Sequence, residues 1–437
     1  MSLKSLLMPV VSQHMLSRQT LLKRRATLER ERQINRQPHR VLYFHQVDDP
    51  YSALTAACLE QFVRRYDVIF TPHLVSPPDD AAAPAREQLI AYSRRDAERL
   101  GRRYGIHFRD GGEQPDRSMA DYTHSMLLAA IDEQRFHTLA GHLSACLWHE
   151  PARIAQFINP LAVPMPADGP SVAAHVAASN ALRRKLGHYL GATFYYAGEW
   201  YWGIDRLHHL ERRLQELGAA KPGVTDLMFP PGRDLTTPVE VPDPPTIDFF
   251  VSLRSPYTAI VARRVYELGR LTGAPVRSRI VLPMVMRGLP VPAEKRSYIA
   301  ADAAREAHVR GIPFGRINDP VGRPVERGTA IFPYARRMGR EQAYIESFLD
   351  GVWARGIDAG SNRGLRRIVE NAGLDWDAAR ACLRDESWRA EVEQNRTDML
   401  ALGLWGVPSF KVRDVAVWGQ DRLWAIQAEL IRGTSAA

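Results

Sequence analysis

The sequence is poor in cysteine. Its 437 residues include three cysteines, Cys58, Cys146 and Cys382, which lie far apart. They form neither a Cys-x-x-Cys pair nor the spacing of a metal site or a disulfide framework. We interpret them as buried or free thiols in a reducing compartment, and therefore expect a cytoplasmic protein.

Long hydrophobic runs are also absent. No apolar run reaches the roughly 18 residues that a membrane span needs. Residues 6–11 are apolar but interrupted by proline, and no small-residue cleavage site follows them, so they do not fit a secretory signal. The apolar fraction of 45% and the charged fraction of 24% are typical of a globular protein. We expect no membrane span.

Acidic residues are scarce near the N-terminus. The formal net charge is +9, and residues 1–40 carry nine Lys and Arg against only Glu29 and Glu31. The rest of the chain is close to neutral and has no zinc-finger or helix-turn-helix signature, so we expect no nucleic-acid partner. Residues 1–39 are predicted to form a basic arm. Two interpretations stay open: a helical or frayed segment, or an arm that touches an acidic partner or a membrane surface.

Histidines give no sign of a metal site. His45, His73, His107 and His124 have neither helical nor Cys-x-x-His-like spacing. We predict no bound metal.

What the chain does contain is an internal repeat. Lys185–Leu207 aligns with Ala401–Leu423 at a constant offset of 216 residues, and Pro50–Leu54 aligns with Pro256–Ile260 at an offset of 206. A repeat of about 200 residues is too long for a solenoid unit. The pattern predicts two copies of one domain.

The two copies differ where chemistry is expected. Asp49 and Ala192 of the first copy align with Ser255 and Pro408 of the second. This asymmetry indicates that a site is retained in the second copy and lost in the first.

Both copies show the same predicted order of elements: strand, helix, strand, helical insert, β-hairpin and final helix. In the first copy these elements are residues 40–44, 51–66, 67–72, 82–186, 193–202 and 205–217. In the second they are residues 247–253, 255–272, 276–281, 293–402, 409–418 and 421–431.

A βαβ unit followed by a hairpin and a terminal helix is the order of a thioredoxin-like fold. The sequence therefore predicts an α/β protein with two tandem thioredoxin-like domains, each with a helical insertion. The predicted domains are residues 40–217, which are degenerate, and residues 246–432, which keep the site. Seven prolines make residues 218–245 a stiff connector.

Three motifs of the second copy occur in order. They are Ile247–Tyr257 with its Ser-Pro-Tyr end; Lys295, Tyr298, Asp302 and Arg305 followed by Gly311–Phe314; and Gly406–Phe410 followed by Trp418–Leu423. Together they resemble the DsbA-like thioredoxin family, in its branch of kappa-class glutathione transferases and 2-hydroxychromene-2-carboxylate isomerases. The first copy resembles this family only faintly.

The resemblance implies that glutathione is the cofactor and that Ser255 is the catalytic residue. Ser255 stands where a strand turns into a helix, so free backbone N–H groups and the helix dipole face it. A serine cannot perform redox chemistry, but its hydroxyl can donate to the thiolate of glutathione. The alternative is that Ser255 is only a helix N-cap, with Pro256 as the first helical residue.

Val407 and Pro408 are predicted to bind the peptide part of glutathione. The corresponding proline is cis in thioredoxin-like folds, so we expect a cis Val407–Pro408 bond and a trans Gly191–Ala192 bond. The Val407 backbone can then pair with the cysteinyl unit, as in β-augmentation. The alternative is a proline at the start of a strand, without a ligand.

The resemblance also implies cofactor contacts at Gln420 and Asp421, which would meet the γ-glutamyl end, and at Lys295, which would face the glycine carboxylate. An Asp at a helix start is equally a routine cap, and a lone Lys is often solvated.

The first copy is predicted not to bind this ligand. Asp49 would repel a thiolate, and Ala192 removes the reason for a cis bond. We expect a pseudo-dimer within the chain, with a homodimer also open. The resemblance implies a glutathione-dependent isomerase or transferase of small electrophilic, aromatic compounds. The alternative is a non-catalytic thioredoxin-like protein that binds a peptide or protein.

Overall fold

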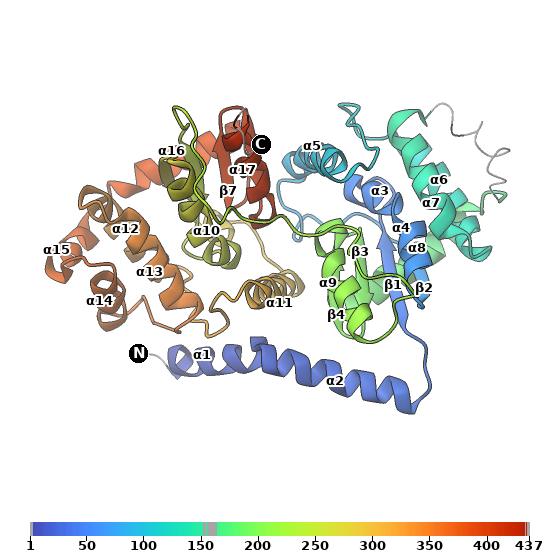
Figure 1. Cartoon of the computed structure of the whole chain (residues 1–437), viewed down its shortest axis with the longest axis horizontal. Coiled ribbons are helices and arrows are strands. Elements are labelled where there is room, and N and C mark those ends of the chain that lie inside the picture. Colours follow the sequence, from blue (N-terminus) through green and yellow to red (C-terminus); the bar gives the residue numbers. More distant parts are fainter. Residues whose placement is uncertain (1–2, 152–153, 155–163, 433, 435–437) are drawn as a thin grey trace. The chain divides into compact units, whose positions relative to one another are not determined.

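The computed structural model describes residues 3–151, 154, 164–432 and 434 of the chain, which form two compact units (Figure 1). Unit 1 comprises the chain up to Arg24, Gly232–Val291, and the chain from Ile299 onward. Unit 2 comprises Arg25–Pro231 together with Pro292–Tyr298.

Unit 2 contains a four-stranded sheet with the order β2-β1-β3-β4. Its strands are β1 (Arg40–His45), β2 (Ile69–Leu74), β3 (Thr193–Tyr196) and β4 (Glu199–Trp202). β1 and β2 are parallel, whereas β3 runs antiparallel to both β1 and β4. The helices that accompany this sheet are α3 (Pro50–Ala56), α4 (Leu59–Arg65), α5 (Arg86–Tyr104), α6 (Arg117–Asp132), α7 (Phe136–His149), α8 (Gly169–Lys185) and α9 (Gly203–Glu216).

Unit 1 contains a second four-stranded sheet with the equivalent order, β6-β5-β7-β8. Its strands are β5 (Ile247–Val251), β6 (Val276–Ile280), β7 (Ser409–Val412) and β8 (Val415–Trp418), and they repeat the same parallel and antiparallel pairings. Its α-helices are α10 (Pro256–Thr272), α11 (Ala293–Val309), α12 (Arg323–Arg337), α13 (Glu341–Trp353), α14 (Asn362–Asn371), α15 (Trp376–Ala381), α16 (Trp388–Ala401) and α17 (Leu423–Ile431), although the start of α11 belongs to unit 2.

The predicted strands and hairpins are confirmed, with small differences at their ends. The helix predicted over 51–66 is instead two helices, α3 and α4, separated at Ala57 and Cys58. Gly141 of α7 packs against this break, so closely that a Cβ there would come within 3.1 Å of the Ala57 Cα. The break between α3 and α4 thus lies where α7 approaches closely, and no local sequence pattern predicts that contact.

The N-terminal arm is helical and consists of α1 (Leu3–Leu16) and α2 (Arg18–Ile34). It does not form one separate body. The chain up to Arg24 packs with unit 1, and the chain from Arg25 belongs to unit 2. Within the described residues, no helix is both long enough and apolar enough to cross a bilayer.

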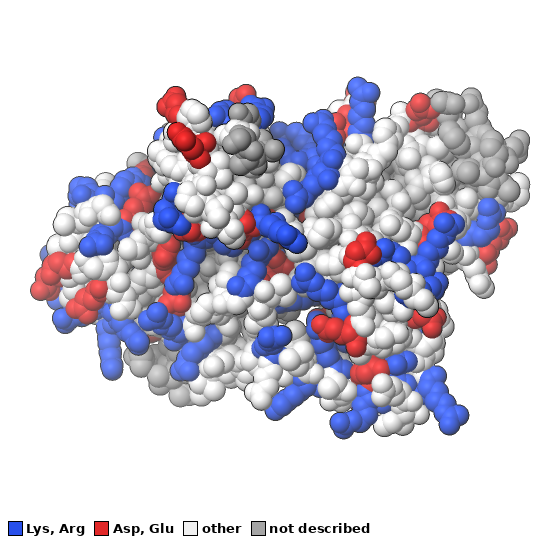
Figure 2. Space-filling model, in the orientation of Figure 1, with Lys and Arg blue, Asp and Glu red and all other residues white. Residues whose placement is uncertain are grey.

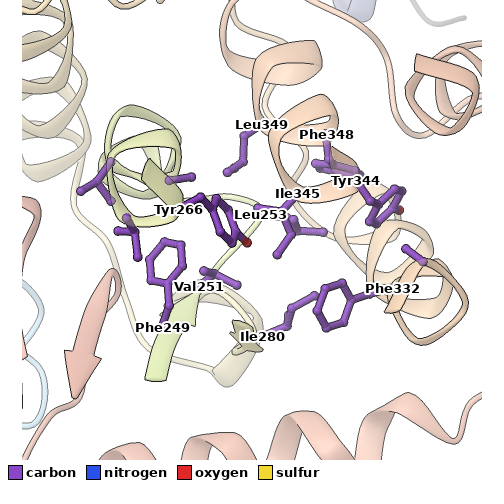
Figure 3. Close-up of a cluster of buried hydrophobic side chains, with 14 of the residues drawn as sticks. Phe249, Val251, Leu253, Tyr266, Ile280, Phe332, Tyr344, Ile345, Phe348 and Leu349 are labelled. Atoms are coloured by element: carbon purple, nitrogen blue, oxygen red, sulfur yellow. The ribbon is translucent and has the colours of Figure 1, made fainter. Parts of the chain in front are cut away.

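The core of unit 1 lies between β5 and the helices that follow it. Phe249, Val251 and Leu253 point from β5 and its end toward α10 and α13, where they meet Tyr266 and Phe348 (Figure 3). All five residues of β5 are buried, and these alternate residues share one face because successive side chains of a strand point to opposite faces. This core fixes the carboxyl end of β5, where the second copy begins α10.

Replacing Phe348 with alanine should test that core. Phe348 is fully buried, so we expect Phe348→Ala to lower the free energy of unfolding by about 3–5 kcal/mol through lost contacts and a residual cavity. Met338→Ala is the matched control, because Met338 is 57% exposed and should change stability by about 0.5 kcal/mol or less. Urea denaturation followed by circular dichroism measures both. Equal effects of the two substitutions would contradict this description of the core.

Candidate functional site

Ser255 lies between β5 and α10 and is partly buried. Its Oγ accepts a hydrogen bond from the Thr258 N–H at 3.1 Å, which makes it the N-cap of α10. The same hydroxyl donates to the Val407 carbonyl at 3.3 Å. The N-cap geometry is therefore confirmed, and it is common to both interpretations of Ser255. The structure also brings together Ser255 and Val407, two residues that the sequence assigns to one site.

Residues 406–408 form what we call the docking edge. The Val407–Pro408 bond is cis, whereas Gly191–Ala192 is not, as predicted. β7 begins its pairing with β5 and β8 only at Ser409, so the docking edge lies outside the sheet ladder. Gly406 is required here, because a Cβ at that position would lie 2.5 Å from the Trp418 ring. The edge is thus held rigidly beside Ser255.

A tyrosine and a carboxylate also join α10 to α11. The Tyr257 hydroxyl donates to Asp302 at 2.8 Å, and Arg305 binds the other oxygen of Asp302 at 2.6 Å. Asp302 and Arg305 are both buried. The Tyr257–Asp302 hydrogen bond holds α11 against the start of α10. Tyr257 is two residues from Ser255, and no role for it was predicted from the sequence.

Unit 2 contains the same arrangement. The Tyr51 hydroxyl donates to Asp96 at 2.8 Å, and Arg99 lies 3.5 Å from the same carboxylate. Asp96 and Asp302 differ by the same offset of 206 residues that relates Tyr51 to Tyr257. Extending this offset into the helical insert would have revealed the pair from sequence alone.

Gln420 and Asp421 stand at the turn that leads into α17. Gln420 is buried; its amide oxygen accepts from Arg264 at 3.1 Å, and its amide nitrogen donates to Glu306 at 3.0 Å and also to Asp421. Arg264 in turn forms a two-point ion pair with Asp234, at 2.7 Å for each contact. Arg264 and Glu306 were not identified from the sequence.

The charges in this network favour the ionised form of Asp234. Burial alone would raise the pKa of Asp234, but its ion pairs with Arg264 and Arg310 hold that pKa below its usual value. Arg310 also lies near enough to Asp421 to interact with it electrostatically. The start of α17 therefore presents Asp421 close to Arg310, one of the two arginines that pair with Asp234.

Lys295 belongs to the other unit. Its ammonium group donates to the Ala82 carbonyl at 2.7 Å and lies 5.9 Å from the centre of the Tyr189 ring. Burial lowers the pKa of Lys295 to about 8. The structure places Lys295 in unit 2 and Ser255 in unit 1, so the predicted contact of Lys295 with the ligand stays a prediction.

Arg254, directly before Ser255, is a paired cation. Its guanidinium binds both oxygens of Asp319, at 2.7 and 2.8 Å. This ion pair offsets much of the positive charge that Arg254 would otherwise contribute to a bound anion. The field at Ser255 therefore comes mainly from the start of α10.

In the first copy, Asp49 occupies the equivalent helix start. Its carboxylate accepts from the Tyr51 N–H at 3.3 Å, from the Ser52 N–H at 2.9 Å and from the Ser52 hydroxyl at 2.8 Å. Desolvation raises the pKa of Asp49 to about 6. The first copy thus satisfies its helix start with its own carboxylate.

Ala192 stands where the second copy has Pro408. The Ala192 carbonyl accepts from the Gly203 N–H at 2.6 Å, just as the Pro408 carbonyl accepts from the Gly419 N–H at 2.9 Å. A Cβ on Gly191 would lie 2.5 Å from the Gln46 Cβ and 3.1 Å from the Ser52 Oγ. Gly191 aligns with Val407 of the docking edge. The space next to Gly191 is therefore occupied by the side chains of Gln46 and Ser52.

Comparison with known proteins gives matches to about one copy. Residues 246–430 match the family model described as a DSBA-like thioredoxin domain. The 2-hydroxychromene-2-carboxylate isomerase of Sphingobium xenophagum is 27% identical over 194 residues, covering 43% of this chain and 98% of that protein. The enzyme of the same name from Pseudomonas putida is 24% identical, covering 43% of this chain and 94% of its own length.

Similar solved structures include a 2-hydroxychromene-2-carboxylate isomerase with 22% identity; the match covers 43% of this chain and 95% of that chain, with a TM-score of 0.38. The family model begins just before β5 and ends within α17, so it spans the strands, helices and turns that surround Ser255.

The raised pKa of Asp49 predicts a specific pH dependence of stability. A carboxyl with a folded-state pKa of about 6 keeps its proton while the unfolded chain, with its ordinary lower pKa, has released it. The folded state therefore loses stability as pH rises through this window. Asp49→Asn keeps a capping oxygen but cannot ionise.

We expect the unfolding free energy of Asp49→Asn, relative to the unsubstituted chain, to increase between pH 4 and pH 7 by about 1–3 kcal/mol. Urea denaturation at a series of pH values measures it. A difference that is the same at every pH would show that Asp49 titrates normally.

Proposed function

We propose that the domain of residues 246–430, which match the family model of a DSBA-like thioredoxin domain, binds glutathione and uses its thiolate to isomerise or conjugate small electrophilic, aromatic compounds. The observation that carries this proposal is the Ser255 hydroxyl, which lies at the start of α10 and 3.3 Å from the Val407 carbonyl. Residues 255–381 contain no cysteine. A dithiol mechanism would therefore lack a thiol at this motif.

Ser255 is the proposed catalytic residue. With glutathione bound, the Ser255 O–H would turn from the Val407 carbonyl to the glutathione sulfur. The free N–H groups and the dipole of α10 would favour a negative charge on that sulfur. Bound glutathione would supply a nucleophilic sulfur for an electrophilic carbon of the substrate, and the role of Ser255 would be to hold that sulfur in its ionised form.

The docking edge and the start of α17 would hold the rest of glutathione. The Val407 backbone lies outside the sheet ladder, so an extended cysteinyl unit can pair with it as one residue of added strand. Asp421 would bind the α-ammonium group of the γ-glutamyl end, and Gln420 would orient it.

We further propose that the chain is a tandem duplication with one degenerate copy, located in the cytoplasm. Two sheets with equivalent strand order and the repeated pairs Tyr51–Asp96 and Tyr257–Asp302 support the duplication. The first copy would act as a permanent partner domain, which makes the chain a pseudo-dimer.

A second candidate function rests on the docking edge alone. A backbone segment that lies beside a strand but outside the sheet ladder can accept an extended peptide, so the second domain can be a non-catalytic peptide- or protein-binding module. The names of the curated relatives favour catalysis, since both are isomerases. Turnover of an aromatic electrophile that requires glutathione distinguishes the two candidates.

Glutathione should bind with a stoichiometry of one per chain. Ser255→Asp copies the first domain's carboxylate into the second, and repulsion of the thiolate should weaken binding by about tenfold or more. Asp49→Asn is the matched control in the other copy and should leave affinity unchanged. Isothermal titration calorimetry on the full chain measures both. Two sites per chain, or a loss caused by Asp49→Asn, would place the ligand elsewhere.

Ser255→Ala separates a catalytic hydroxyl from a mere helix cap. We expect this variant still to bind glutathione, because the docking edge is intact, but the pKa of the bound thiol should rise by about one unit or more. Thiolate absorbance in the ultraviolet, recorded against pH, gives that pKa. An unchanged titration curve would leave Ser255 with a capping role alone.

A further inference from the structure

The inner face of α1 is fixed to unit 1. The Ser12 Oγ accepts from the Ile317 N–H at 2.9 Å, and Gln13 accepts from Arg316 at 3.3 Å. Gly356 allows a close approach here, since a Cβ at that position would lie 2.6 Å from Pro9. Leu16 packs against the core of unit 1. This helix is therefore docked rather than loosely attached.

The opposite side of α1 is apolar and exposed. Leu7, Val10, Val11 and Met15 are 54%, 57%, 54% and 68% exposed, and we call them the outer face of α1. Leu7 is three residues from Val10 and four from Val11, and Met15 is four residues from Val11, so all four lie on one side of a helix, away from the side that carries Ser12. These exposed apolar side chains, with exposed His14 among them, form a cluster on a folded surface that indicates a docking site.

The charge of the surrounding segment is of one sign. The first 24 residues contain Lys4, Arg18, Lys23 and Arg24 and no acidic residue. Arg18 and Arg24 are exposed, as is Leu22, which continues the apolar cluster into α2 at 47% exposure. Figure 2 shows Lys and Arg side chains, with some Asp and Glu side chains between them, along the part of the surface where Figure 1 draws α2. A helix with an apolar face and cationic flanks suits a surface that is apolar inside and anionic outside.

We propose that the outer face of α1 docks on an anionic lipid bilayer, with its apolar side chains in the acyl boundary and the flanking cations at the headgroups. At about 1.5 Å per residue, the 14 residues of α1 are too short to span a bilayer, so the helix lies in the interface. A second copy of the chain is a poorer occupant, because it would bring two all-cationic segments together. This proposal is independent of glutathione binding.

Co-sedimentation of the full chain with vesicles tests the proposal. We expect binding to vesicles that contain phosphatidylserine and phosphatidylcholine, weaker binding to phosphatidylcholine alone, and release at high salt. The double substitution Leu7→Ser and Val11→Ser should weaken binding by about tenfold or more, since it removes two buried apolar side chains. The matched control is Val309→Ser with Met338→Ser, which alters two residues that are 53% and 57% exposed elsewhere in unit 1.

Three results would overturn the proposal. The first is no binding to either vesicle type, and the second is equal binding by the α1 variant and the unsubstituted chain. The third is a dimer in sedimentation velocity that the α1 substitutions dissociate, which would make a second copy the occupant. Circular dichroism of each variant establishes that the fold is retained, as expected for exposed positions.

Discussion

The first backbone N–H groups of a helix have no partners inside the helix. In each sheet of this chain, a central strand leads directly into such a helix start: β1 into α3, and β5 into α10. What satisfies those groups decides what else can bind there. In the second copy a single hydroxyl, that of Ser255, accepts one N–H and leaves the helix field directed at the docking edge. In the first copy the carboxylate of Asp49 accepts two N–H groups and the Ser52 hydroxyl, so the position is already filled by negative charge.

The surrounding frame is shared, so the difference between the copies is local. Both sheets have equivalent strand order, and in both a tyrosine next to the helix start binds an aspartate of the following insert at 2.8 Å. The open end of each hairpin is also held alike, through the carbonyls of Ala192 and Pro408. A fold of this kind tolerates loss of the site because its stability comes from the core, not from the ligand position.

Much of this could be predicted from the sequence, and the gaps have physical causes. Strands and hairpins follow from short-range periodicity, and the meeting of Ser255 with Val407 follows from the family resemblance. The break between α3 and α4 depends on the approach of α7, which is a tertiary contact. The position of Lys295 depends on the unit with which the start of α11 packs. Its hydrogen bond to the Ala82 carbonyl joins residues far apart in the sequence, so no local pattern predicts it. Arg264, which binds Gln420, carries no motif of its own.

The central claim is that only the second copy holds an open thiol site. A crystal structure of the chain with glutathione tests it most directly. The account predicts ligand density in unit 1 alone, with the sulfur within hydrogen-bond distance of the Ser255 Oγ and the cysteinyl backbone paired with Val407. Density beside Asp49, or a glutathione sulfur turned away from Ser255, would contradict it.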